Sequence, residues 1–189
     1  MKTLFIFLIT LLSIFIVACH SKSKDASNED TQFYPAKSFI IAEINKLDTI
    51  PLAVLRKTVV NNKTDSAYIS KEEFRKAAGV FLEPDISDPK LKKLYKETVF
   101  MDNTVNAITL TYSPGENEAE VRKMDVLLDP GNNKLERIYM EKKKKSGDSL
   151  ITRKLMWNAG HSCQVITLIK VGNQPETVLN EKYVWDERE

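Results

Sequence analysis

The residue types that perform most enzyme chemistry are scarce in this chain of 189 residues. It has two histidines, His20 and His161, and no HExxH or CxxC spacing that would build a zinc site. His161 follows Gly160 at an expected turn, and no Gly-x-Ser-x-Gly elbow supplies a nucleophile for it. The six glycines form no phosphate-binding loop. We therefore expect no catalytic residue, metal or cofactor; a hydrolase that uses His161 or a carboxylate pair is the weaker alternative.

The acidic clusters are better explained by turns and helix caps than by chemistry. Asp85 and Asp88 flank an expected helix start, where Asp88 would cap the first turn. Residues 129–133, with the sequence Asp-Pro-Gly-Asn-Asn, have the first acid of a calcium loop but neither its second acid nor its closing Glu. This segment therefore predicts an ordinary turn.

The strongest charge cluster is a run of four lysines, Lys142, Lys143, Lys144 and Lys145, which we expect at the tip of a β-hairpin. There they could contact anionic headgroups or an acidic partner, each lysine contributing about 1 kcal/mol near such a surface. The simpler interpretation, which we prefer, is a solvated tip that protects a strand end from edge pairing. The whole chain carries a net charge of only +2, so we expect no binding of nucleic acid.

The N-terminus is typical of an export signal. Lys2 precedes an apolar run over residues 4–17 that is interrupted only by Thr10 and Ser13. As a helix, residues 3–18 would span about 24 Å, less than the roughly 30 Å of a bilayer's hydrocarbon core. The length therefore favours a signal peptide over a permanent membrane helix.

The sequence Ile16-Val17-Ala18-Cys19 resembles the lipobox of bacterial lipoproteins. The resemblance implies cleavage between Ala18 and Cys19 and acylation of Cys19, whose two or three acyl chains would anchor the protein in a membrane. In that family an Asp after the cysteine favours inner-membrane retention in some bacteria, so His20 favours the outer membrane. We expect the protein on its periplasmic side, although His20 does not decide the leaflet. The alternative is an ordinary secretory signal with a chance cysteine.

Acylation of Cys19 would leave Cys163 without a disulfide partner. Cys163 begins an apolar run that extends to Ile169, so we expect a packed and unreactive thiol.

Three segments follow from this pattern: a signal peptide over residues 1–18, a lipidated cysteine with a flexible tether over 19–32, and a single domain over 33–189. Residues 20–32 contain no large apolar side chain. Such a chain has a typical reach of about 20 Å and a maximum of about 45 Å. It would act as a spacer between the membrane and the domain.

The first half of the domain predicts three helices and one hairpin. Ile40, Ile44 and Leu47 are spaced as one face of a helix over residues 36–47, with Pro35 suited to its first turn. Ser70 and Glu73 form a capping box for a second helix, which should end near Ala78. The remaining expected elements are a β-hairpin of residues 52–60 and 64–69, and a helix that begins at Asp88-Pro89 and turns Leu91, Leu94 and Tyr95 inward.

The second half predicts an antiparallel β-meander, because apolar-rich runs alternate with short turns. The six runs cover residues 104–112, 120–128, 134–143, 149–157, 162–171 and 177–185. We therefore expect an α+β fold with a curved antiparallel sheet of about eight strands and about three helices. Residues 126–128 and 165–169 are apolar on both faces, which predicts that the sheet is covered on both sides in places, either by the helices or by the sheet curling over itself.

Two functions remain compatible with these features. The preferred one is a non-enzymatic envelope lipoprotein that acts as a binding or interaction module, with the membrane and an envelope protein as partners. The alternative is a carrier or sensor of an apolar ligand in a half-closed sheet, which would resemble in architecture the carriers of lipids and lipoproteins in bacterial envelopes. Trp157, Tyr183 and Trp185 could line the mouth of such a cavity, although large aromatics more often close a core.

The chain as a whole looks like small lipoproteins of Bacteroidota, which have no established activity. The segments that carry this resemblance are residues 33–40, 62–66, 128–130, 156–157 and 163–167.

Overall fold

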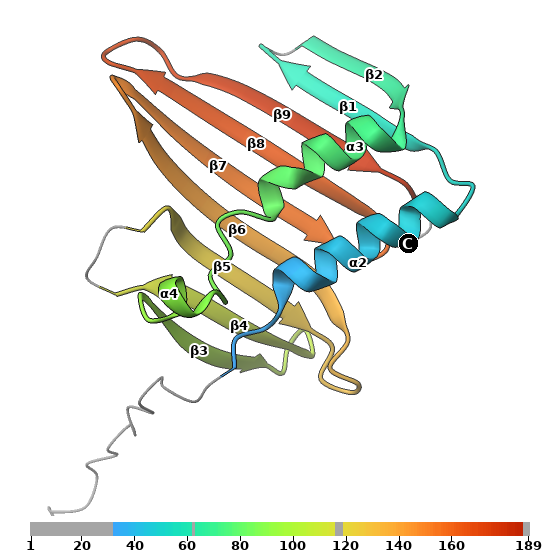
Figure 1. Cartoon of the computed structure of the whole chain (residues 1–189), viewed down its shortest axis with the longest axis vertical. Coiled ribbons are helices and arrows are strands. Elements are labelled where there is room, and N and C mark those ends of the chain that lie inside the picture. Colours follow the sequence, from blue (N-terminus) through green and yellow to red (C-terminus); the bar gives the residue numbers. More distant parts are fainter. Residues whose placement is uncertain (1–31, 62, 116–118, 187–189) are drawn as a thin grey trace, which may run out of the picture.

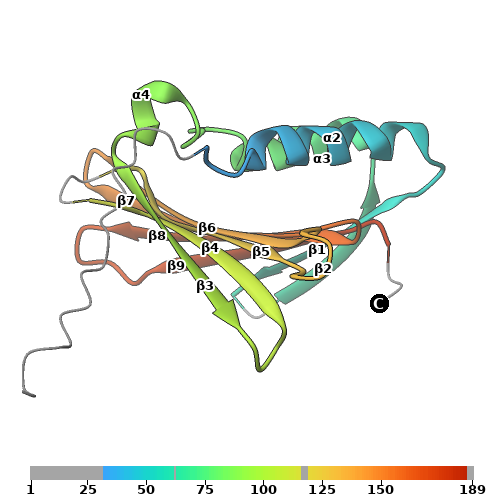
Figure 2. The ribbon, with the colours of Figure 1, turned by 90° about the horizontal axis from the view of Figure 1, so that it is seen from below.

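The computed structural model describes residues 32–61, 63–115 and 119–186. The expected signal peptide, the Ala18–Cys19 cleavage site and most of the tether lie outside the described residues. The described chain forms two layers, a single antiparallel sheet of nine strands and a layer of helices against one of its faces (Figures 1 and 2). This confirms the α+β class with an antiparallel sheet, which is open rather than closed.

The sheet has the strand order β2-β1-β9-β8-β7-β6-β5-β4-β3, so the seven C-terminal strands form a meander and the first hairpin joins it through β1 and β9. The helical elements are α2 (Ala36–Thr49), α3 (Lys71–Ala78), the 3₁₀ turn η1 (Gly79–Phe81) and α4 (Pro89–Lys92). The strands are β1 (Val54–Val60), β2 (Lys63–Ile69), β3 (Tyr95–Asp102), β4 (Ala107–Pro114), β5 (Val121–Leu128), β6 (Leu135–Ser146), β7 (Ser149–Asn158), β8 (Ser162–Val171) and β9 (Thr177–Val184).

The helix caps and the turn predicted from the sequence form the expected hydrogen bonds. The Ser70 hydroxyl accepts the backbone N–H of Glu73, and the Glu73 carboxylate accepts the backbone N–H of Ser70 at 2.9 Å, which completes the capping box of α3. The Asp88 carboxylate accepts the N–H of Lys90 at 2.8 Å, with Pro89 in the first turn of α4. The Asp129 carboxylate accepts the N–H of Gly131 at 2.7 Å, which confirms a turn at residues 129–133.

The prediction that the third helix includes Tyr95 is wrong. Helix α4 ends at Lys92, and Tyr95 begins β3, which pairs with β4 along its whole length. Thr98, Val99 and Phe100 favour a strand, and Asp102 closes the hairpin by accepting the N–H of Thr104 at 2.8 Å. This additional strand brings the described total to nine instead of about eight.

The core lies between the sheet and the helices. Phe74 of α3 and Phe81 of η1 pack their rings against Trp157 of β7, with centroid distances of 6.3 and 5.2 Å. Trp185 also contacts both Phe74 and Trp157, so aromatic side chains fill the centre of this layer. Within the described residues, no helix is both long and apolar enough to span a bilayer.

Candidate binding site on the uncovered sheet face

The strand register assigns each side chain to one of the two faces of the sheet. Residues paired directly across antiparallel strands share a face, and neighbours along a strand alternate between faces. Ile138, Trp157 and Cys163 lie in one cross-strand row, and all three are buried beneath the helices. The next row, shifted by one residue, therefore lies on the opposite face. It contains Tyr139, Met156, Gln164, Lys182 and Lys57.

No described residue outside the sheet covers this second face, which we call the uncovered face (Figure 2). The expectation of cover on both sides is therefore wrong for the described part of the chain. The apolar side chains that prompted this expectation divide between the two faces. Val126 and Val165 are buried under the helices, whereas Leu127, Ile166 and Leu168 lie on the uncovered face and are only half-buried. The uncovered face therefore combines half-buried apolar side chains with charged ones.

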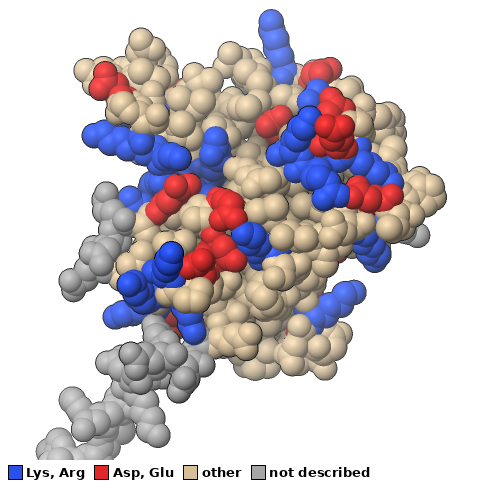
Figure 3. Space-filling model, viewed as in Figure 1, with Lys and Arg blue, Asp and Glu red and all other residues tan. Residues whose placement is uncertain are grey.

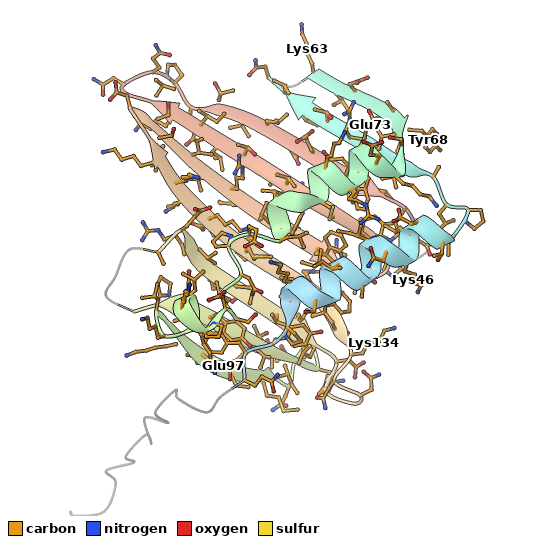
Figure 4. All side chains as sticks on the ribbon, in the orientation of Figure 1. Lys46, Lys63, Tyr68, Glu73, Glu97 and Lys134 are labelled. Carbon is orange, nitrogen blue, oxygen red and sulfur yellow. The ribbon has the colours of Figure 1, made fainter. Side chains whose placement is uncertain are left out.

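A hollow with a volume of about 750 Å³ lies at the end of the uncovered face where the β5–β6 and β7–β8 turns meet. Its lining includes four basic side chains, Lys57, Lys134, Arg137 and Lys182, together with His161. The acidic side chains around it are Asp129, Glu136 and Asp186. Lys134 marks this corner in Figure 4.

Lys57 and Lys182 form the most unusual contact of the hollow. They lie directly opposite each other on β1 and β9. Like charges in this position destabilise a sheet, and within the described residues neither amine forms an ion pair. An anionic group bound between the two ammonium groups would relieve their repulsion.

His161 lies at the rim of the hollow, in the β7–β8 turn. Its carbonyl oxygen accepts the backbone N–H groups of Trp185 and Asp186 at 3.1 and 3.2 Å, so its backbone holds the C-terminal end of the described chain against the sheet. The turn position agrees with the sequence interpretation. The described residues contain no group of three or more His, Cys, Asp or Glu side chains that would hold a metal ion.

The four lysines of residues 142–145 do not form one patch at a hairpin tip. All four lie within β6, so alternation sends Lys142 and Lys144 to the helix side and Lys143 and Lys145 to the uncovered side. Lys143 pairs with Glu141 at 3.2 Å, and Lys144 and Lys145 are exposed. A surface contact through Lys143, Lys144 and Lys145 stays a prediction.

The prediction of a surface role for Lys142 is wrong, because this side chain is only 4% exposed. Its ammonium group donates hydrogen bonds to the carbonyl oxygens of Val80 and Glu83, at 2.8 and 2.7 Å. Loss of hydration lowers the pKa of Lys142 to about 8, against the opposing effect of Glu120. These two hydrogen bonds therefore join η1 and the segment that follows it to β6.

The remaining candidates from the sequence lie in the core. Cys163 is buried, and burial raises the pKa of its thiol well above the usual value, which keeps it protonated and unreactive. Trp157, Tyr183 and Trp185 are also buried and pack around Phe74. The space between η1, α2 and the sheet, next to Phe81, Met124 and Met140, has a volume of about 10 Å³, which is room for about one water molecule.

The helix side carries charged side chains of both signs. Figure 3 shows basic and acidic side chains intermingled there, over the helices. Three ion pairs of this side, Arg75 with Asp48, Lys76 with Glu72 and Lys37 with Glu83, neutralise charges across α2, α3 and the loop after η1. The uncovered face also carries two ion pairs, Lys123 with Asp125 and Lys143 with Glu141. What distinguishes Lys57 and Lys182 is therefore their position directly opposite each other on β1 and β9.

Sequence reasoning does not find the Lys57–Lys182 pair, because β1 and β9 are distant in the chain. In β1, Lys57 alternates onto the same side as Leu55 and Val59, so the pattern of that strand gives no sign of a charged pair. Only the register between β1 and β9 places the two lysines opposite each other. Comparisons with models of protein families, with curated proteins and with solved structures found no match to this chain.

Proposed function

We propose that the protein is a non-enzymatic interaction module, held at a bacterial membrane surface by acylated Cys19, that binds an envelope protein through its uncovered sheet face. The observation that carries this proposal is the difference between the two faces of one sheet. One face is packed against helices, while the other exposes half-buried Tyr139, Met156 and Ile166 among lysines. Apolar area of this kind gains free energy when a partner removes it from water.

The charges indicate what the partner presents. The unpaired ammonium groups of Lys57 and Lys182, with Arg137 nearby in the hollow, favour a carboxylate or another anionic group. The half-buried apolar side chains beside them favour an apolar contact. A protein segment that carries acidic and apolar side chains together fits both requirements.

A carrier of an apolar ligand is less well supported. It needs room for an acyl chain between the helices and the sheet, and the cavity there has a volume of about 10 Å³. Phe74, Phe81 and Trp157 occupy that layer instead. We therefore base the proposal on the outer surface of the sheet.

The location belongs to the same proposal and rests on residues 1–20. The apolar leader and the sequence Ile16-Val17-Ala18-Cys19 favour a lipid anchor, and His20 favours the outer membrane, where we place the domain on the periplasmic side. The tether of residues 20–32 would keep the domain within about 45 Å of that surface.

Site-specific photo-cross-linking in the bacterial host tests the binding face. A photoreactive amino acid replaces either the exposed Lys154 on the uncovered face or the exposed Ile41 on α2, which points away from the core. We expect a discrete cross-linked protein from position 154 and none from position 41. Lys57→Glu/Lys182→Glu should abolish the cross-link, whereas Lys63→Glu on the outer strand β2 should not. Equal cross-linking from both positions, or no effect of the charge reversal, would contradict the proposal.

A further inference from the structure

The outer edge of β3 differs from the rest of the described surface. Among the described strands, β3 lies at the end of the sheet and pairs with β4 alone. Three consecutive apolar side chains near its end are exposed: Val99 by 59%, Phe100 by 61% and Met101 by 53%. Val105, in the turn that follows, is exposed by 69%. Apolar side chains therefore project from both faces of this strand.

The opposite edge of the sheet shows how an edge is normally protected. β2 has the sequence Lys-Thr-Asp-Ser-Ala-Tyr-Ile, so polar and charged residues predominate along it. Figure 4 shows Lys63 and Tyr68 projecting from that edge and Glu97 on β3. Natural edge strands avoid pairing through charges, prolines, bulges or short length. β3 is eight residues long, contains no proline and pairs with β4 without a register shift.

The charges of β3 are self-complementary in an antiparallel arrangement. A twofold axis perpendicular to the sheet at Val99 places Val99 opposite its own copy and Thr98 opposite Phe100. The same axis places Lys96 of each copy opposite Asp102 of the other copy, which gives two such pairs of opposite charge. Glu97 then lies opposite Met101, so every residue from 96 to 102 has a partner on the same face.

The place where the described chain begins suits the same symmetry. Phe33 packs against Tyr112 of β4 with ring centroids 4.7 Å apart, and the backbone N–H of Tyr34 donates to the Tyr112 hydroxyl at 3.0 Å. Tyr112 faces the helix side, so the described chain begins on that side and one strand away from β3 (Figure 2). A twofold axis perpendicular to the sheet leaves both helix layers on the same side. The described parts of both copies would then begin on the same side of the joined sheet, which is compatible with two copies anchored in one membrane.

We propose that the protein forms a twofold dimer in which the β3 strands of two copies pair antiparallel about Val99 and continue the sheet from one subunit into the other. The unpaired backbone groups of each outer edge then bond to the other copy. The contact is small, and confinement of both copies to one membrane raises their effective concentration enough for a small contact to suffice. The two uncovered faces become one continuous surface. The pairing goes beyond the proposed function; it rests on the proposed membrane anchor but not on the partner of the uncovered face.

Disulfide trapping of the full chain in its bacterial host tests the pairing and its register. Val99→Cys should give a disulfide-linked dimer on non-reducing electrophoresis, because residues opposite each other in an antiparallel pair are about 5 Å apart and within disulfide range. In Thr98→Cys and in Phe100→Cys, the cysteine of one copy lies about 8 Å from the same residue of the other copy. We therefore expect several-fold less disulfide-linked dimer than with Val99→Cys. The wild-type chain, which contains Cys19 and Cys163, shows how much disulfide-linked dimer forms without an added cysteine.

Two further variants check the same geometry. Glu97→Cys alone should not cross-link, whereas the double variant Glu97→Cys/Met101→Cys should, because each new thiol then faces one of the other copy. In the Val99→Cys background, Lys96→Glu should lower the dimer yield about fivefold or more, since it faces Asp102, while Lys93→Glu should leave it unchanged.

The outcomes separate the alternatives. Trapping at Phe100→Cys in place of Val99→Cys would overturn the register. No trapping at any position of β3, or trapping at the control Tyr68→Cys to the same extent, would overturn the dimer and would favour another protein or the membrane as the cover of this edge. Neither result affects the photo-cross-linking from position 154, so the dimer and the proposed binding face fail independently.

Discussion

The Glu43 carboxylate on α2 accepts a hydrogen bond from the indole Nε1–H of Trp157 on β7 at 2.7 Å, across 114 positions of sequence. The same carboxylate accepts the backbone N–H of Gly160 at 3.0 Å, in the turn that follows β7. Trp157 is fully buried. Glu43 therefore joins the helix layer to the centre of the sheet and to the turn beside the hollow.

Glu43→Ala should lower the free energy of unfolding by about 1–3 kcal/mol, because it leaves the buried indole N–H without an acceptor. Urea unfolding followed by tryptophan fluorescence measures this change. Glu72→Ala, which removes a solvent-exposed pair with Lys76, is the matched control and should change stability by less than about 0.5 kcal/mol. Equal effects of the two substitutions would contradict a structural role for Glu43.

Lys142 predicts a pH dependence of stability. Burial lowers its pKa to about 8, while an unfolded lysine has a pKa of about 10.4. Between these values the unfolded chain binds more protons than the native one, so the contribution of Lys142 to stability rises with pH. Relative to Lys142→Met, the wild-type free energy of unfolding should rise by at most about 3 kcal/mol from pH 8 to pH 10.5.

The comparison with Lys142→Met isolates this lysine, because both proteins contain the same tyrosines. Lys144→Met, on the same strand and the same side but exposed, should show no such change relative to wild type across this interval. A constant difference between wild type and Lys142→Met from pH 8 to pH 10.5 would show that the native ammonium group is not desolvated.

Cys163 should react with thiol reagents only when the protein opens. Its side chain is buried on the helix side of β8, and burial raises the pKa of the thiol. In a chain whose Cys19 is blocked by acylation or replaced by serine, we expect labelling of Cys163 to be negligible without denaturant and to follow the unfolding transition. Val178→Cys, at an exposed position of β9, should label rapidly under native conditions. Rapid labelling of native Cys163 would contradict its place in the core.

Local signals in the sequence account for much of the fold. The Ser70–Glu73 capping box, the Asp88-Pro89 helix start and the turn at residues 129–133 all form with the partners that their spacing predicts. The same kind of signal misses β3, because Leu91, Leu94 and Tyr95 are spaced like a helix face, while the pairing that makes Tyr95–Asp102 a strand comes from β4. Long-range pairing overrides a local pattern in that segment.

The candidate site depends more strongly on long-range packing. Ile138, Met140 and Lys142 occupy every second position of β6, so the periodicity of the strand predicts that Lys142 is buried with the other two. Its charge argues against burial, and sequence reasoning therefore misses it. The uncovered face has no such signal. Long-range contacts, such as that of Glu43 with Trp157, decide which face the helices cover. The pairing of β1 with β9 decides that Lys57 and Lys182 lie opposite each other.

Metabolic labelling with a tagged fatty acid decides whether the protein is anchored at a membrane, because the proposed role there requires acylation of Cys19. The full chain and its Cys19→Ser variant are produced in a bacterial host, and the label in the purified protein is measured. We expect the wild-type chain to carry the label and to sediment with membranes, and Cys19→Ser to do neither. A wild-type chain that is exported and folded but carries no fatty acid would contradict the proposed anchor and the function that rests on it.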